Sequence, residues 1–425
     1  MTTLRPVRAI SRSDLTLAIV NAVIGSAIFG MPAKIASFTG VLSPLAHVIA
    51  AIGVLTIILC FAEVASRFEE SGGAYLYARE AFGLHVGFQA GWLLLWTRLL
   101  SAAANLNVFV DYLSQILPVV AEGVGRAIVI LSVLFVITSI NLIGVKQASW
   151  AIDLFTIGKL LPLILLVVIG LPRVSTAILN TQTVAVPQWN EAILFLVFAF
   201  GGFEAPLMSA GEAKDARKDS AFALLAGLAI VAAVYVSVQF VTIGIVANLA
   251  REKAPIAAAF FSLFGPPGLW FASFAAMISV WGWATGNGLQ SPRLLYSMAD
   301  RGELPSPLAR IHPRFLTPYV SIIAFSIVAG TLAIVGTFEG NAILSAIVRL
   351  IIYAMVCVSL WVFRKNLGPA GFHLRFAAPV SALALGFCLY MLSTRSFAQA
   401  GIILAAMIAG HFFLFVQIRT RARAA

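Results

Sequence analysis

The sequence predicts an all-α integral membrane protein with twelve transmembrane helices. Of its 425 residues, 61% are hydrophobic and only 11% are charged, whereas a soluble domain carries roughly 25% charged residues. The apolar residues form continuous runs, while the strands of an outer-membrane β-barrel would alternate polar and apolar residues. One helical span needs about 20 apolar residues, so twelve spans account for nearly all of them. This composition excludes a soluble enzyme, a disordered chain and a disulfide-stapled secreted domain.

Apolar runs joined by short polar connections are the candidate spans. They cover residues 13–38, 41–66, 83–117, 126–144, 148–170, 190–210, 221–247, 268–297, 318–336, 341–363, 375–393 and 398–417. The first run resembles a signal peptide because arginines precede it. The apolar run continues past the small residues of a possible cleavage site, and further spans follow. We therefore expect that no signal peptide is cleaved.

The distribution of Lys and Arg predicts the orientation. With the N-terminus inside, nineteen of the 28 Lys and Arg residues fall on the inner side and six on the outer side. Because basic residues favour cytoplasmic loops, we expect both tails (1–12 and 418–425) in the cytoplasm. The sequence has no Asn-x-Ser/Thr sequon, which fits a bacterial chain, so the expected location is the inner membrane of a bacterial cell. The remaining three, Arg98, Lys159 and Arg349, fall within spans, where a charge is costly and indicates function.

Spans one and six are expected to be broken helices. Span one reads GSAIFGMP over residues 25–32, and span six reads FGGFEAP over residues 200–206. Glycine weakens a helix and proline removes a backbone donor. Breaks at corresponding positions of two halves are typical of secondary transporters, whose substrate site lies between them.

The two broken spans divide the chain into two groups of five, and an odd number of spans makes the groups inverted relative to each other. The expected regions are repeat 1 (13–170), repeat 2 (190–363) and two further spans (375–417), between the two tails. An unwound helix offers N–H groups to an anion and carbonyls to an ammonium. A zwitterion with both groups on one carbon, an amino acid, is the expected ligand.

Five motifs in this order resemble the amino acid–polyamine–organocation (APC) permease superfamily, over essentially all twelve spans. They lie at residues 25–29 (GSAIF), 61–68 (FAEVASRF), 71–75 (SGGAY), 200–214 (FGGFE leading to GEAK) and 300–305 (DRGELP). The resemblance implies a LeuT-like fold: a 5+5 inverted repeat with broken helices 1 and 6, followed by two extra C-terminal helices.

The resemblance also implies the substrate-binding residues. The backbone amides of residues 25–27 would hold the substrate carboxylate, and the carbonyls of Val23, Phe198 and Gly201 would take its amino group. The predicted set is Val23, Ile24, Gly25, Ser26, Ala27, Phe198, Gly201, Gly202 and Phe203. The family commonly has glycine where Ala27 stands, so its methyl group is expected to narrow the carboxylate end.

Two charged residues are expected to take part in coupling. By resemblance, the ammonium of Lys159 occupies the place that sodium takes between spans one and eight in related transporters, so transport is expected to be sodium-independent. A buried lysine is also able to exchange protons. Glu204 either orients the break of span six or carries protons. Trp281 and Trp283 are candidate gates, against the alternative that they pack between helices.

The predicted function is secondary active transport of small or medium neutral L-amino acids by alternating access, through proton symport or exchange. No acidic residue lies in the middle of spans three, eight or ten to pair with a cationic side chain. A polyamine or other organocation permease is the alternative, and a transporter-like sensor is a third. Hydrolase and phosphate-loop motifs are absent, so neither an enzyme nor an ATP-driven pump is expected. No cofactor, metal, nucleic acid or obligate protein partner is predicted; the partners are the substrate and the lipid bilayer.

Overall fold

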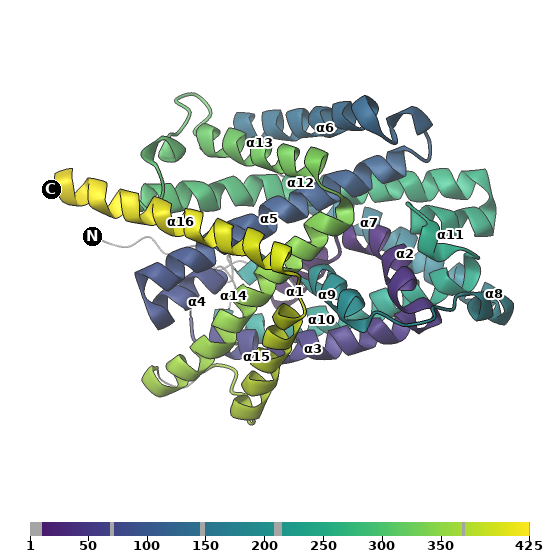
Figure 1. Ribbon diagram of the computed structural model, residues 1–425, viewed down its shortest axis with the longest axis horizontal. Helices are drawn as coiled ribbons and strands as arrows, with labels where there is room; N and C mark the ends of the chain where they lie inside the picture. The colour runs from purple at the N-terminus through teal and green to yellow at the C-terminus, as the bar shows by residue number, and fades with distance from the viewer. Residues whose placement is uncertain (1–10, 69–71, 145–148, 208–214, 368–369, 425) are drawn as a thin grey trace.

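In the computed structural model, helices lie over all the predicted spans (Figure 1). The structure describes residues 11–68, 72–144, 149–207, 215–367 and 370–424. The longer helices are α1 (Arg12–Val23), α2 (Ala27–Thr39), α3 (Ser43–Ala65), α5 (Leu84–Leu113), α6 (Gly123–Ile143), α7 (Ser149–Gly170), α9 (Trp189–Phe200), α10 (Ala216–Ile245), α12 (Pro266–Asp300), α13 (Tyr319–Val335), α14 (Phe338–Asn366), α15 (Ala377–Ser393) and α16 (Phe397–Ala424). Among the described residues, six helical segments are long and apolar enough to cross a membrane. Which helices cross it, and how the two repeats are related, remain predictions.

Short helices outside the predicted spans complete the bundle. They are α4 (Gly73–Phe82), α8 (Thr176–Thr181) and α11 (Pro255–Phe264). Gly83 separates α4 from α5 with a φ of 83°, a conformation that only glycine adopts without strain. The chain therefore turns sharply there, and α4 packs against α5.

Span one is broken, as predicted. A capping box of Ser11 and Asp14 starts α1. The helix stops at Val23, and helical structure resumes at Ala27 as α2. Ser26 makes no side-chain hydrogen bond at the start of α2, so its hydroxyl does not cap the first N–H groups of that helix.

Span six is also broken, as predicted. The helix α9 ends at Phe200, Gly201 is extended, and Gly202 has a φ of 110°. Residues 201–205 form turns, and residues 206–207 are in 3₁₀ conformation. The break therefore lies at the two glycines, and the positive φ of Gly202 is the conformation that requires glycine.

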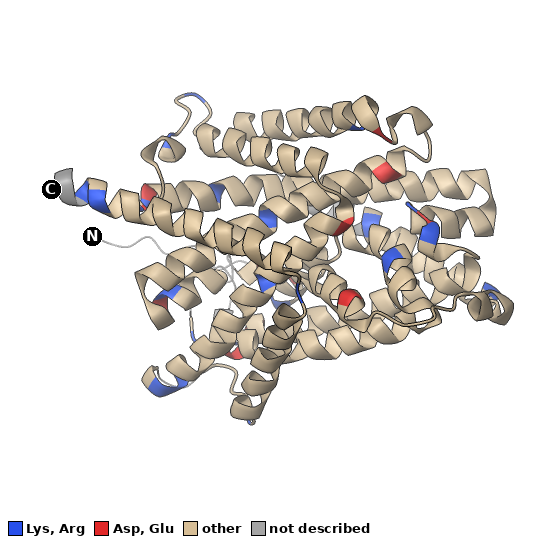
Figure 2. Ribbon diagram, viewed as in Figure 1, with Lys and Arg blue, Asp and Glu red and all other residues tan. Residues whose placement is uncertain are grey.

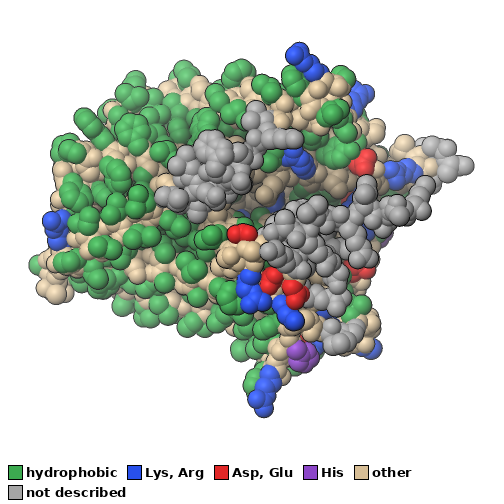
Figure 3. All heavy atoms as spheres, turned by 180° about the vertical axis from the view of Figure 1, so that it is seen from behind, with side chains coloured by type: hydrophobic (Ala, Val, Ile, Leu, Met, Phe, Trp, Pro, Cys, Tyr) green, Lys and Arg blue, Asp and Glu red, His purple; other side chains and the backbone are tan. Residues whose placement is uncertain are grey.

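The helix α5 forms the centre of the bundle and packs against α14, α12 and α13. In its most apolar window 89% of the residues are buried, compared with 22% in α6 and 17% in α16. Apolar side chains cover most of the face in Figure 3, and charged ones gather toward one side. Basic residues near the ends of α4, α14 and α16 lie at one end of the molecule (Figure 2), the end that the sequence assigns to the cytoplasm.

Candidate functional site

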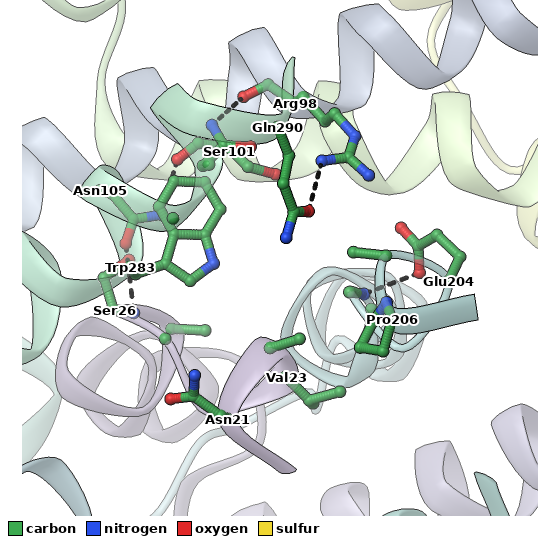
Figure 4. Close-up of a pocket in the computed structure, with 18 of the residues that line it drawn as sticks. Asn21, Val23, Ser26, Arg98, Ser101, Asn105, Glu204, Pro206, Trp283 and Gln290 are labelled. Atoms are coloured by element: carbon green, nitrogen blue, oxygen red, sulfur yellow. Dashed lines mark hydrogen bonds between the residues drawn. The ribbon is translucent and has the colours of Figure 1, made fainter. Parts of the chain in front are cut away.

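A cavity of about 240 Å³ lies where the two helix breaks face each other (Figure 4). Its wall is built by α1, α2, α5, α9, α12, α14 and the turns after α9. The predicted residues on this wall are Val23, Gly25, Ser26, Ala27, Phe198, Gly201, Gly202, Glu204 and Trp283. The two breaks that were predicted separately therefore meet in one site.

Four predicted site residues lie outside the wall, and Lys159, described below, is one of them. Ile24 is completely buried. Phe203 stacks on Tyr353, with ring centroids 5.2 Å apart. Trp281 packs into a separate apolar cluster between α5, α6 and α13, so of the two candidate gates Trp283 is the one that lines the cavity.

The carboxylate end of the predicted site lies at the N-terminus of α2. The Ser26 amide donates to Asn105 Oδ1 over 3.3 Å. The buried Ser26 Oγ has no hydrogen-bond partner among the residues that the structure describes. An unpaired buried hydroxyl is costly unless a ligand satisfies it, and the helix dipole favours an anion at this position.

The predicted ammonium end lies at the C-terminal ends of α1 and α9. The Tyr235 hydroxyl, completely buried on α10, lies 3.1 Å from the Val23 carbonyl oxygen and 3.2 Å from that of Ala199. The Gly25 amide also donates to the Val23 carbonyl, and the Gly201 amide donates to that of Phe198. A carbonyl oxygen has two lone pairs. The Phe198 carbonyl therefore has one left for an ammonium group, and the Val23 carbonyl has one left when the Tyr235 proton goes to Ala199.

The side chain of Lys159 contacts the broken first span from outside the cavity wall. It is buried on α7, and its Nζ donates to the Asn21 carbonyl over 2.6 Å. Asn21 lies in the last turn of α1, where the helix dipole is negative and carbonyls lack helical partners. The ammonium therefore supplies a positive charge beside the cavity.

The carboxylate of Glu204 binds groups on both sides of the second break. It accepts from the Gly202 amide over 2.9 Å and from the Tyr353 hydroxyl over 3.2 Å. It also forms an ion pair with Arg349 of α14. Arg349 in turn donates to Ser101 Oγ over 3.2 Å and fills the space beside Gly201, where a side chain would clash with it. The break is thus fixed by a buried charged pair.

Several polar residues of the wall were not among the predicted site residues. On α5 they are Arg98, Ser101 and Asn105, and on α12 they include Asn287 and Gln290. Positions 98, 101 and 105 follow the i, i+3, i+7 spacing of one helix face. Such a polar stripe in an apolar span is the sequence signal that identifies them. Asn21, Ala22 and Pro206 also line the cavity.

The described residues contain no cluster of three or more His, Cys, Asp or Glu side chains that could hold a metal ion. Cys60, Cys357 and Cys388 are free and buried, in keeping with apolar packing. The cavity wall itself presents backbone groups, hydroxyls, amides and fixed charges. Such groups bind a polar solute reversibly.

The amino acid permease family model matches residues 10–417. The serine/threonine exchanger SteT of Bacillus subtilis is 28% identical over 363 residues, which cover 83% of this chain and 82% of the exchanger. The branched-chain amino acid permease BcaP of the same organism is 26% identical, covering 91% of this chain and 87% of the relative. Asc-type amino acid transporter 1 of Homo sapiens is 29% identical, covering 75% and 64%.

The family match spans nearly the whole chain, and its relatives are transporters rather than enzymes. Two broken helices around a central polar cavity agree with that match. The chain belongs to the amino acid permease family, within the APC superfamily.

Proposed function

We propose that this permease carries small or medium neutral L-amino acids across the cell membrane by alternating access, without sodium, through proton symport or exchange. The N-terminus of α2 binds the carboxylate, and the carbonyls at the ends of α1 and α9 bind the ammonium. The transporter names of the relatives support an amino acid as the substrate. It needs no cofactor and no obligate protein partner.

The charges around the cavity support this substrate class over a polyamine. Its wall carries two arginines, Arg98 and Arg349, but one glutamate, Glu204. Lys159 adds a further positive charge behind Asn21. Because the cationic groups outnumber the anionic one, a polyamine or a cationic side chain would meet repulsion in a site where charges are poorly screened.

The observation that carries sodium independence is the 2.6 Å hydrogen bond from Lys159 Nζ to the Asn21 carbonyl. A cation at the C-terminal end of α1 stabilises exposed carbonyls, which is what a bound sodium ion would do there. With a covalently attached ammonium in place, a second cation would add repulsion. Glu204 is already engaged by three donors, so Lys159 is the candidate proton carrier.

The test is uptake of labelled alanine, leucine, arginine, glutamate, putrescine and uracil into proteoliposomes, in sodium and in choline buffers. Neutral amino acids should enter equally in both buffers, and Lys159→Ala should reduce transport while the protein still folds. Lys34→Ala is the matched control, because Lys34 forms a half-exposed ion pair with Glu339 away from the cavity. Strict sodium dependence, together with normal transport by Lys159→Ala, would contradict the proposal.

A further inference from the structure

A shallow apolar groove lies between α5 and α16 and shares no lining residue with the central cavity. Its volume is about 470 Å³, and it is lined by Gln89, Met407, Ile408, His411, Phe412 and Phe415. Ile408, Phe412 and Phe415 are exposed, although α16 is apolar enough to span a membrane. In a bilayer, the groove therefore faces the acyl chains of lipids.

Side chains of α5 fix the position of α16 along this groove. Gln89 Nε2 donates to the Met407 carbonyl over 2.9 Å, and Trp92 Nε1 donates to the Ala406 carbonyl over 2.8 Å. The Trp92 ring also fills the space beside Gly410, where a Cβ atom would lie 2.5 Å from Trp92 Cδ1. The two walls of the groove are thus held together by specific contacts.

The groove becomes polar and basic toward the C-terminal end of α16. The exposed imidazole rings of His85 and His411 lie with their centres 5.3 Å apart. Arg419 follows His411 by about two turns of helix, and its guanidinium carbon lies 4.3 Å from the centre of the Phe415 ring. Within the described part of the chain, no carboxylate forms an ion pair with Arg419.

This order of groups matches the order of groups in a phospholipid. The apolar side chains suit an acyl chain, the imidazole N–H groups suit ester carbonyls, and a guanidinium suits a phosphate. The end of α16 lies where basic side chains gather at one end of the molecule (Figure 2), and basic residues just beyond a span attract anionic lipids. A phosphate could pair with Arg419 without displacing a carboxylate.

We propose that the groove between α5 and α16 binds an anionic phospholipid, with an acyl chain along Ile408, Phe412 and Phe415 and the phosphate on Arg419. A zwitterionic lipid carries a choline cation beside its phosphate, and Arg419 would repel that cation. Only 17% of the most apolar window of α16 is buried inside the protein. A lipid bound across both helices adds contacts that hold α16 on α5, so binding should stabilise the folded protein.

The test is native mass spectrometry of the detergent-purified protein, titrated with phosphatidylglycerol or with phosphatidylcholine of identical acyl chains. The wild type should bind phosphatidylglycerol about tenfold more tightly, the value expected from one hydrogen bond between charged groups, and its melting temperature should rise. Arg419→Gln should reduce the preference to less than threefold. Phe412→Ala should weaken the binding of both lipids equally, because it removes groove surface but no charge.

Arg375→Gln is the matched control. Arg375 is also exposed and lies over a phenylalanine, with its guanidinium carbon 5.5 Å from the centre of the Phe376 ring, but it does not line the groove. This variant should keep the tenfold preference. Equal binding of the two lipids by the wild type, or an unchanged preference in Arg419→Gln, overturns the proposal.

Two further outcomes separate the lipid from other occupants. Glycerol 3-phosphate, which has the anionic group but no acyl chain, should not displace phosphatidylglycerol; displacement at equal concentration would indicate a site for free phosphate and overturn the lipid. A dimer that excludes lipid and is lost in Phe412→Ala would assign the groove to a second copy of the chain, and would also overturn the lipid.

Discussion

The two broken helices lie close together at Gly202, which provides a sensitive test of the site. A Cβ atom at Gly202 would lie 2.7 Å from the Ala22 carbonyl oxygen and 3.3 Å from its carbon. Both are backbone atoms of α1 and cannot rotate away. The φ of 110° at Gly202 is also one that alanine rarely adopts. We predict that Gly202→Ala forces the two breaks apart.

The cost combines two terms. A non-glycine residue held at such a φ costs about 1–3 kcal/mol, and overpacking adds about 1–3 kcal/mol. The expected sum is roughly 2–6 kcal/mol, and each 1.4 kcal/mol that falls on the substrate-binding state lowers affinity tenfold. Gly202→Ala should therefore lower the melting temperature, or lower substrate affinity at least tenfold, or do both.

The assay measures substrate affinity by scintillation proximity and thermal stability on the same detergent-purified protein. Gly386→Ala is the matched control, because Gly386 lies within α15 outside the cavity and a Cβ there meets no atom within 4 Å. Gly386→Ala should keep affinity and gain about 0.5–1 kcal/mol of helix stability. A Gly202→Ala protein with wild-type affinity and wild-type melting temperature would refute the reasoning.

Three further predictions concern the remaining parts of the site and the orientation. Glu204→Gln or Arg349→Met alone should destabilise the protein by about 3–5 kcal/mol, because each leaves a buried charge unpaired. In thermal denaturation the double variant should lose less stability than the two single variants together, and strictly additive losses would contradict the ion pair. Gly25→Val should abolish substrate binding while the protein still inserts, because Trp283 is already 3.1 Å from a Cβ there; unchanged affinity would remove the carboxylate assignment. A cysteine replacing Arg173 should react with an impermeant thiol reagent in sealed cells, and one replacing Arg421 should not. The native cysteines are buried, so they should add little background labelling, and the reverse pattern would overturn the orientation.

The helix breaks could be predicted because their cause is local. Glycine and proline act on their own turn of helix, so the residues at 25–32 and 200–206 were sufficient to predict both interruptions. Lys159 was recognisable for the same reason, since an ionised side chain in a span needs an explanation wherever it packs. Its carbonyl partner, Asn21, was not, because the contact joins α7 to α1 across 138 residues of sequence.

The partners and directions of other side chains could not be predicted. Arg349 and Glu204 are 145 residues apart, and their meeting depends on how α14 packs against the turns after α9. Helical periodicity gives the direction of a side chain only while the helix continues. The positive φ of Gly202 changes the course of the chain, so that Phe203 packs against Tyr353 outside the cavity.

The carbonyl groups at the ends of two broken helices compete for the hydroxyl proton of Tyr235. The hydroxyl has one proton, yet it lies within hydrogen-bonding distance of two carbonyl oxygens, those of Val23 on α1 and Ala199 on α9. The proton can serve only one of them at a time. An ammonium that donates to the Val23 carbonyl would leave the Tyr235 proton to the Ala199 carbonyl. When the ammonium departs, the Tyr235 hydroxyl could donate to the Val23 carbonyl again. The arrival of substrate at one broken helix would then change the hydrogen bonding of the other, through a single shared proton.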